Sequence, residues 1–450
     1  MILQFLLSAL FLITGISADE SPDITVIVRG SDLLAEVDDS FVCATLDWWP
    51  PEKCNYNQCP WGQASVLNLS TGLFGFSQGC LSLARWDELN LLFEKGGAII
   101  TFGLNALNGR DSLDNGMWVG NWNSTNSREF IEYTISKGYQ VDSWEFGNEL
   151  SGRGVGARVS AEQYAQDVIE LKALLKELYR DSHTKPILVA PGGFFDQQWY
   201  AQLLQDSGLG VVDALTHHVY NLGGGDDSHI ESKILNPWYL SQTATDKFRN
   251  LQLTIERHGP WSRAWVGEAG GAYNSGNRQT KTGLMKLSAL LWHRLMGKGV
   301  LSIDMSGSSY LRAYALCAKR KSGITLLLIN LSTSIKFSVT VRNDLNVLLA
   351  EGGGIQWGNA FIRTLKRTVS WIGRKASDES VHREEYHLTG ADGNCLSQTV
   401  LLNGNPLELV DGEIPQLVPV YAPANSPVKV DPLSIAFVVF PNFEAQACSS

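Results

Sequence analysis

Short apolar segments alternate with amphipathic helices along the first two thirds of this 450-residue chain, and this alternation constrains its fold most strongly. The apolar segments have the length and composition of buried strands; they are residues 41–46, 98–107, 141–150, 186–193, 211–220 and 262–271. The clearest helix is 161–179, where Ser160 and Gln163 form a capping box before an apolar face. This alternation predicts a parallel sheet of the α/β class, arranged either as a barrel or as a doubly wound sheet.

The pattern changes at about residue 305. From 305 to 450 the segments have almost no helical period, which predicts an all-β sandwich domain. Residues 24–29 also read as a strand, and we expect the segment 19–40 to pair with the β-sandwich. The barrel domain is therefore expected to cover residues 41–304.

Composition limits the function classes. With 44% hydrophobic residues the chain can bury a sizeable core, and a net charge of −10 without a basic run argues against a nucleic-acid partner. Residues 1–18 read as a signal peptide, with small residues after a short apolar stretch. No other stretch is apolar enough to span a membrane. We expect a monomer that is secreted, extracellular or in the cell wall, with a vacuolar, lysosomal or membrane-peripheral location as alternatives.

Three N-glycosylation sequons fit a secretory route, at Asn68, Asn123 and Asn330. Seven cysteines leave at least one without an internal partner. Cys54 and Cys59 could close a local loop, but no second ligand pair near them indicates zinc. His217 and His218 would face opposite sides of a strand, so they do not predict a metal site either. No cofactor and no metal are expected.

Two glutamates end predicted strands beside glycines: Glu149 in "WEFGNEL" and Glu268 in "AWVGEAGG". In a parallel barrel all such strand ends lie on one face, so the two carboxylates should converge. They would then form the minimal apparatus of retaining glycoside hydrolysis, with one acid and one nucleophile. The alternative is two unrelated strand-end acids. The serine-hydrolase pattern "GFSQG" at 75–79 lacks a buried strand before it, so it does not indicate an esterase.

Several motifs together resemble plant heparanase-like proteins of glycoside hydrolase family 79, from about residue 24 to the end: "WEFGNEL", "GEAGGAYNSG", "FGLNALNGR", "ATLDWWP", "GFSQGCL" and "LLWHRLMGKG". The resemblance implies a retaining hydrolase, a β-glucuronidase, that cleaves β-linked glucuronic acid from secreted or cell-wall glycans. Glu149 would be the acid/base at the end of strand four, and Glu268 the nucleophile at the end of strand seven. The expected partner is a uronic-acid-containing polysaccharide or proteoglycan glycan, with endo or exo cleavage left open.

The same resemblance implies roles for other residues. Asn148 would bind the sugar 2-hydroxyl and Asp47 another sugar hydroxyl. Tyr220 would support Glu268, although a half-buried aromatic at a strand end is the alternative. Tyr273, with Asn274 and Ser275, would lie near the substrate carboxylate. The family also implies a disulfide between Cys317 and Cys448.

The chain departs from the family pattern in two places. Residues 61–81 run across a position where the family has a helix and a strand, and only one helix fits between Glu268 and the β-sandwich. We therefore expect an incomplete (β/α)8-type barrel with exposed edges. Two internal deletions, from alternative splicing or an incorrect gene model, would explain both gaps. The rival to an enzyme is a catalytically impaired remnant that acts at most in carbohydrate binding.

Overall fold

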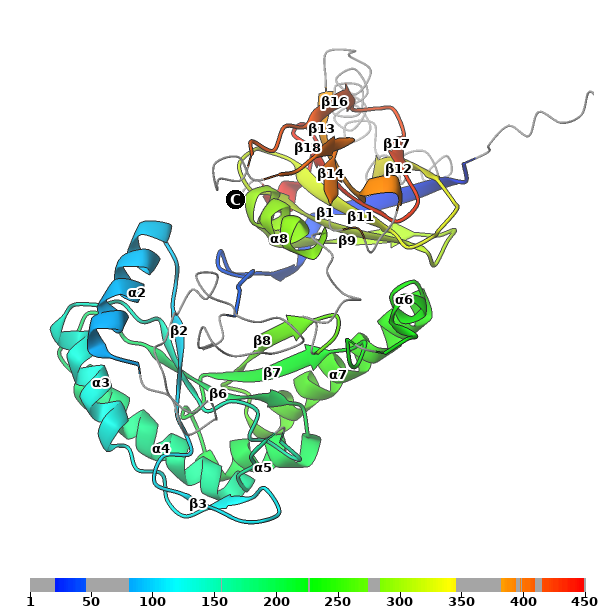
Figure 1. Cartoon of the computed structure of the whole chain (residues 1–450). Helices are drawn as coiled ribbons and strands as arrows, with labels where there is room; N and C mark the ends of the chain where they lie inside the picture. Colours follow the sequence, from blue (N-terminus) through cyan, green and yellow to red (C-terminus); the bar gives the residue numbers. More distant parts are fainter. Residues whose placement is uncertain are drawn as a thin grey trace, which may run out of the picture. The chain divides into compact units, whose positions relative to one another are not determined.

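The computed structural model describes residues 21–45, 81–154, 156–225, 227–273, 284–344, 382–393, 397, 399–408 and 415–448. These residues form two compact units (Figure 1). The β unit holds strand β1 (Asp23–Glu36) and the elements from helix α8 (Leu284–Leu295) onward. The α/β unit holds the elements from α2 (Leu83–Gly96) to β8 (Arg263–Gly270).

Five parallel strands form the sheet of the α/β unit. Their order is β2 (Thr101–Leu104), β5 (Ser143–Phe146), β6 (Ile187–Phe194), β7 (Ala214–Tyr220) and β8, and each overlaps one predicted strand. Strands adjacent in the chain are adjacent in the sheet, with α3 (Thr125–Ser136), α4 (Ala161–Leu178), α5 (Gln197–Ser207), α6 (Ile230–Ile234) and α7 (Pro237–His258) between them. This confirms the βα repeat of a (β/α)8-type barrel. Within the described ranges the sheet remains open, with β2 and β8 at its edges.

The helix side of this sheet is a dense apolar core. Trp144 and Phe146 of β5 are fully buried, as are Val168 and Leu171 of α4. The side chain of Ser160 accepts a hydrogen bond from the backbone N–H of Gln163, which caps α4 as the sequence predicts. Trp144 and Phe146 of β5 therefore face the helices, and the residues that alternate with them, Ser143 and Glu145, lie on the opposite face. A short hairpin, β3 (Asp111–Ser112) and β4 (Trp118–Val119), follows β2.

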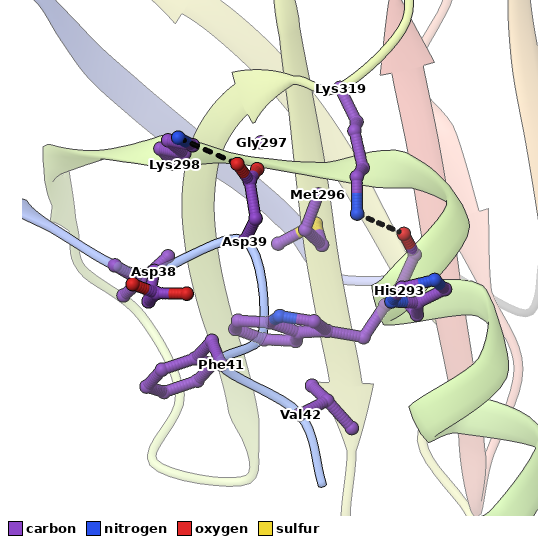
Figure 2. Close-up of a pocket in the computed structure, with 11 residues that line it drawn as sticks. Asp38, Asp39, Phe41, Val42, His293, Met296, Gly297, Lys298 and Lys319 are labelled. Carbon is purple, nitrogen blue, oxygen red and sulfur yellow. Dashed lines mark hydrogen bonds and ion pairs between the residues drawn. The ribbon is translucent and has the colours of Figure 1, made fainter. Parts of the chain in front are cut away.

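The prediction of a strand at 41–46 is wrong for the residues that the structure describes there. Residues 41–45 form bends and irregular backbone, and Phe41 is 55% exposed. Its ring lies 5.9 Å from Trp292 in a hollow of the β unit (Figure 2). In the same hollow Asp39 pairs with Lys298 at 2.7 Å, and Lys319 donates to the carbonyl of His293. The described part of this run, residues 41–45, is thus irregular rather than a strand, and Phe41 at its start packs beside Trp292 in the β unit.

An eleven-stranded sheet forms the β unit, in the order β15-β14-β13-β18-β11-β10-β9-β1-β12-β17, with β16 paired to β13. β1 pairs antiparallel with β9 and parallel with β12, so the N-terminal strand completes this sheet. β9, which the sequence places at the end of the barrel domain, also belongs here. The remaining bounds are β9 (Met296–Met305), β10 (Leu311–Ala318), β11 (Ile324–Asn330), β12 (Phe337–Asn343), β13 (His382–Gly390), η2 (Ala391–Gly393), β14 (Val400–Leu402), β15 (Asn405–Pro406), β16 (Val420–Pro423), β17 (Val428–Val430), β18 (Ser434–Phe440) and η3 (Gln446–Cys448).

The sheet folds back on itself around a core. Val428 of β17, at one end of the strand order, shares a buried cluster with Leu326 of β11 and Val438 of β18. Phe437 and Val439, which flank Val438 on β18, point to the other face of the sheet and pack with Leu291 of α8. The two ends of the strand order therefore share one core, which is the arrangement of a β-sandwich, and α8 covers apolar side chains on the outer face. In the part of the chain that the structure describes, no helix combines the length and apolarity of a membrane span.

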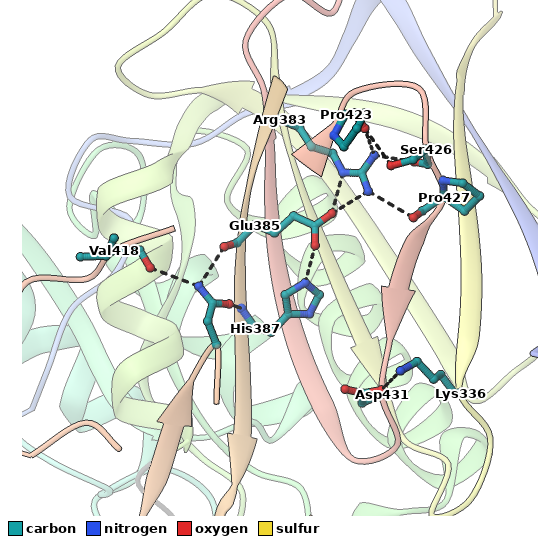
Figure 3. Close-up of polar contacts among 10 residues, drawn as sticks. Lys336, Arg383, Glu385, His387, Val418, Pro423, Ser426, Pro427 and Asp431 are labelled. Carbon is teal, nitrogen blue, oxygen red and sulfur yellow. Dashed lines mark hydrogen bonds and ion pairs between the residues drawn. The ribbon is translucent and has the colours of Figure 1, made fainter. Parts of the chain in front are cut away.

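A buried ion-pair network holds the turn between β16 and β17 (Figure 3). Arg383, only 1% exposed, pairs with Glu385 at 2.6 Å, and the other oxygen of Glu385 lies 2.7 Å from Nε2 of His387. The guanidinium of Arg383 also donates to the carbonyls of Pro423 and Pro427, at 2.6 and 3.2 Å. Buried charges of this kind persist when their hydrogen bonds are satisfied, as they are here.

The cysteines and sequons fall in different environments. A disulfide joins Cys317 of β10 to Cys448 of η3, with their Cα atoms 5.3 Å apart. Asn123 is exposed, whereas Asn330 is 1% exposed and its amide nitrogen donates to the carbonyls of Ile335, Val430 and Asp431. A glycan on that nitrogen is incompatible with this fold, so the expectation for Asn330 is corrected. Asn68 lies outside the described residues.

Candidate active site

Alternate residues of β7 each contact a different glutamate. The hydroxyl of Thr216 donates to Oε1 of Glu145 at 2.9 Å. Nδ1 of His218 lies 2.9 Å from Oε1 of Glu149, and the hydroxyl of Tyr220 donates to Oε2 of Glu268 at 2.8 Å. Because side chains two apart on a strand point to the same face, this row follows from the i, i+2, i+4 spacing. The glutamates come from β5, the loop after it, and β8.

The two glutamates singled out from sequence do converge. Nδ1 of His218 lies between them, 2.9 Å from Glu149 and 3.7 Å from Oε2 of Glu268. One carboxylate oxygen of each glutamate and one ring nitrogen of His218 all lie within 4.8 Å of one another. These donors are near enough to hold a cation, and they also take part in hydrogen bonds: His218 bonds to Glu149, and Tyr220 donates to Glu268. The same arrangement fits acid–base and nucleophilic chemistry.

The backbone at Glu149 adopts a rare conformation. Its φ is 53°, in the left-handed region, and its N–H donates to the carbonyl of Gly192 at 2.6 Å. Gly147, two residues earlier, has φ 76°, and a Cβ there would lie 3.0 Å from the Cβ of Ala106. A non-glycine residue in such a conformation costs about 1–3 kcal/mol and is held by its surroundings. Glu149 is thus presented by a tight turn that needs glycine beside it.

The site is electrostatically asymmetric. Burial lowers the pKa of His218, but its hydrogen bond to Glu149 and the charges of Glu268, Glu149 and Glu145 outweigh burial, so the net pKa is raised. Burial raises the pKa of Glu145, opposed by the Thr216 hydrogen bond and by His218. In this site with three carboxyl groups, the surroundings therefore favour the protonated form of His218 and the neutral form of Glu145.

The other histidine faces away from the site. His217 bonds through Nδ1 to the carbonyl of Trp265 at 3.0 Å and lies 5.6 Å from the ring of Phe248 on α7. Burial lowers its pKa. The prediction that His217 and His218 point in opposite directions is confirmed.

The remaining predicted residues are placed less completely. Asn148 is half-buried next to Glu149. Tyr273 is 47% exposed, and its backbone bonds to Gly223 and Gly225 at 2.9 and 2.7 Å. Asp47, Asn274 and Ser275 lie outside the described residues. Sequence reasoning missed Glu145, Thr216 and the role of His218. The sequence contains patterns that could have indicated them. Glu145 lies four residues before Glu149, and Thr216, His218 and Tyr220 have the i, i+2, i+4 spacing that places side chains on one face of a strand.

Two glutamates held together at the carboxyl ends of parallel strands, in a βα-repeat sheet, define a glycosidase of the (β/α)8 class. The sequence profile described as "Glycosyl hydrolase family 79, N-terminal domain" matches residues 23–72 and 69–288, and the chain belongs to this family of glycosyl hydrolases.

Two known proteins are similar to this chain in sequence, and a solved structure is similar to it in fold. The chain is 47% identical to "Heparanase-like protein 2" of Arabidopsis thaliana, over 94% of this chain and 95% of the relative. It is 32% identical to "Baicalin-beta-D-glucuronidase" of Scutellaria baicalensis, over 96% and 94% of the two chains. A Paenibacillus polymyxa xyloglucanase of glycoside hydrolase family 44 shares the fold with a TM-score of 0.56 at 10% identity, over 94% of this chain and 100% of that one.

The alignment also bears on the missing segments. It is 515 positions long for the Arabidopsis relative, whereas this chain has 450 residues, so at least 65 positions are filled by the relative alone. The family profile matches in two pieces that meet at residues 69–72, inside the region where the sequence lacks a helix and a strand. Both observations support the hypothesis of internal deletions.

Proposed function

We propose that this chain is a retaining β-glucuronidase of the heparanase-like type, with Glu268 as nucleophile and Glu149 as acid/base. The observation that carries the proposal is the approach of the two carboxyl groups, whose oxygens lie within 4.8 Å of each other on either side of His218. Retaining glycosidases keep their carboxyl groups about 5–5.5 Å apart, whereas inverting enzymes separate them by about 6.5–9.5 Å to admit a water.

The proposed reaction has two steps. In the first, a carboxylate oxygen of Glu268 bonds to the anomeric carbon, the bond to the leaving oxygen breaks, and Glu149 gives that oxygen its proton. In the second, Glu149 takes a proton from water, the water oxygen bonds to the anomeric carbon, and Glu268 is released. Tyr220 orients Glu268 through its 2.8 Å hydrogen bond, and His218 balances the negative charge of the site.

The substrate class is proposed from the relatives and from Tyr273. One relative is named as a β-D-glucuronidase, at 32% identity over most of both chains. Tyr273 is exposed and follows β8 closely, where its hydroxyl can hold an anionic group without a strong positive charge. We propose a β-linked glucuronic acid in a polysaccharide or proteoglycan glycan, bound also by Asn148 and, outside the described residues, by Asp47, Asn274 and Ser275. We further propose a secretory route, with a glycan on Asn123.

A catalytically impaired, carbohydrate-binding remnant is the second candidate. The family match and the relatives do not favour it, and it rests on the incomplete barrel that the sequence predicts. A parallel sheet with unpaired edges holds reacting groups less rigidly than a closed barrel does.

Turnover of nitrophenyl β-D-glucuronide by the full chain tests the proposal, with nitrophenyl β-D-glucoside as the matched substrate. We expect a clear preference for the glucuronide, and the first-formed product in proton NMR should be the β-anomer. Equal rates on both substrates would contradict the substrate class. An α-anomer as first product would contradict retention, and no turnover of either substrate would favour the remnant.

A further inference from the structure

The site contains a third carboxyl group for which the proposed reaction has no use. Glu145 lies on β5, four residues before Glu149, and its carboxylate faces the same side of the sheet as Glu149 and Glu268. Its strand neighbours Trp144 and Phe146 point into the helix-side core instead. A carboxyl group inside a compact active site is costly unless it has a structural or chemical task.

A chain of hydrogen bonds links Glu145 to the backbone of Glu149. Oε1 of Glu145 accepts from the Thr216 hydroxyl at 2.9 Å, and that hydroxyl oxygen accepts from the N–H of Gly192 at 2.8 Å. The carbonyl of Gly192 in turn accepts from the N–H of Glu149 at 2.6 Å. Three strands thus contribute to one path that ends at the acid/base residue.

Gly192 occupies an irregular point of β6. The pairing between β6 and β7 shifts register between Ala190 and Gly193, and Gly192 has φ 57°. A Cβ on Gly192 would lie 2.8 Å from Oε1 of Glu145, so the carboxyl group packs directly against this backbone. On the other side, the Tyr200 hydroxyl lies 2.8 Å from the carbonyl of Gly193. The irregular segment is therefore clamped between Glu145 and Tyr200.

Glu149 depends on this clamp because its own backbone is unfavourable. With φ 53° it would relax toward the ordinary regions if the bond to Gly192 were lost. A shift of the backbone would move the acid relative to the leaving oxygen, and catalysis falls steeply with such displacements.

We propose that Glu145 is a positioning residue that holds the acid/base Glu149 in place through Thr216 and the irregular segment at Gly192. The role rests on the proposed glycosidase function. The ionisable groups that face Glu145 are His218, Glu268 and the buried hydroxyls of Tyr164 and Tyr200. Burial raises the pKa of Glu145, which favours a neutral acid that adds no third negative charge beside Glu149 and Glu268.

Three variants separate positioning from general destabilisation. Glu145→Gln retains the shape and neutrality of the acid and should keep activity within about threefold of the parent. Glu145→Ala and Thr216→Val break the path, and each should lose about 10–100-fold in kcat on a glucuronide with a poor leaving group, the effect of one lost hydrogen bond. With nitrophenyl glucuronide, which needs little protonation, the loss should be much smaller. Thr254→Val removes a buried hydroxyl from α7 and is the matched control, with activity unchanged.

Equal losses on good and poor leaving groups, or an equal defect in Glu145→Gln and Glu145→Ala, would overturn the proposal. A measurement of stability against pH reports on Glu145 without any substrate. Because folding raises its pKa, Glu145 contributes most below its unfolded pKa of about 4.5, and this contribution is lost as the pH rises through the folded pKa. Glu145→Gln should therefore gain stability relative to the parent between pH 5 and pH 8. If the parent turns over no glucuronide, the proposed function fails. The stability measurement still tests the inference in that case, because a difference between Glu145→Gln and the parent that does not change with pH would overturn it.

Discussion

Nδ1 of His218 lies 2.9 Å from Oε1 of Glu149, across the intervening strand β6. The same nitrogen is 3.7 Å from Oε2 of Glu268, so one imidazole adjoins both carboxyl groups of the proposed reaction. His218 is 2% exposed, and the site around it contains three carboxyl groups. We therefore expect the protonation of His218 to influence the pH range in which the pair works.

Replacing His218 should move the pH profile. In His218→Gln the site loses a positive charge, which makes ionisation of the neighbouring carboxyl groups harder, so the profile of kcat/KM should shift to higher pH. Loss of a charge-assisted hydrogen bond, about 1.5–3 kcal/mol, should also lower kcat/KM by about 10–100-fold. The control is His217→Gln on the opposite face, which should leave the profile in place. An unshifted profile for His218→Gln would contradict the assignment.

The stability of the same variant should depend on pH. Because folding raises the pKa of His218, the protonated ring stabilises the fold fully below the unfolded value of about 6.5, and this contribution disappears as the pH rises through the folded value. The loss of unfolding free energy in His218→Gln should therefore be larger at pH 5 than at pH 9. Urea unfolding at both pH values measures this loss. A loss of unfolding free energy that is larger at pH 9 than at pH 5 would contradict the prediction.

Substitutions of Glu149 and Glu268 should impair hydrolysis in different ways. Glu149→Gln should slow hydrolysis by about 10²–10⁴-fold on poor leaving groups, the usual contribution of general acid catalysis, yet spare activated ones. Azide should restore its turnover by attacking the glycosyl intermediate in place of water. Glu268→Gln should abolish turnover and the covalent intermediate, which mass spectrometry of the parent with a slow fluorinated glucuronide would detect. Full activity in either variant would refute the roles.

The disulfide should stabilise the β unit by closing a long loop of the chain. Cys317 and Cys448 are separated by 131 residues, and closing a loop of that size contributes about 4–5 kcal/mol in the chain-entropy account. The double variant Cys317→Ser/Cys448→Ser should lose a comparable unfolding free energy, whereas Cys43→Ser, at an exposed free cysteine, should lose none. Mass spectrometry of non-reduced peptides should show the linkage directly; two free thiols in the isolated protein would refute it.

Restoring the missing segments should raise both activity and stability. A chimera can take them from the Arabidopsis relative that is 47% identical, inserted near residues 69–72 and after β8. We expect added strands to cover the edges at β2 and β8, which stiffens the support of Glu149 and Glu268. Glucuronidase assays and thermal unfolding of both chains provide the comparison. Similar values for the two would show that the open sheet is already a complete catalytic unit.

Local patterns in the sequence determined much of this protein. Five of the predicted strands are present, because the strands of a parallel sheet are largely buried and read as near-continuous apolar runs. Glu149 and Glu268 stood out because each ends a strand beside a glycine, and the family motifs around them assigned the class. The prediction of a strand at 41–46 was wrong for the described residues, since an apolar run does not say whether its residues will join a sheet, and Phe41 packs beside Trp292 in the β unit instead.

Only the tertiary structure decided how the site is held together. Glu145 meets Thr216 across 71 positions of sequence, and His218 meets Glu149 across 69. These contacts depend on strand register and on the irregular segment at Gly192, where the backbone leaves the regular ladder. Sequence periodicity can show that Thr216, His218 and Tyr220 share one face of a strand. It cannot show which carboxyl group each will meet, because that is set by how neighbouring strands align, which depends on packing along the whole sheet.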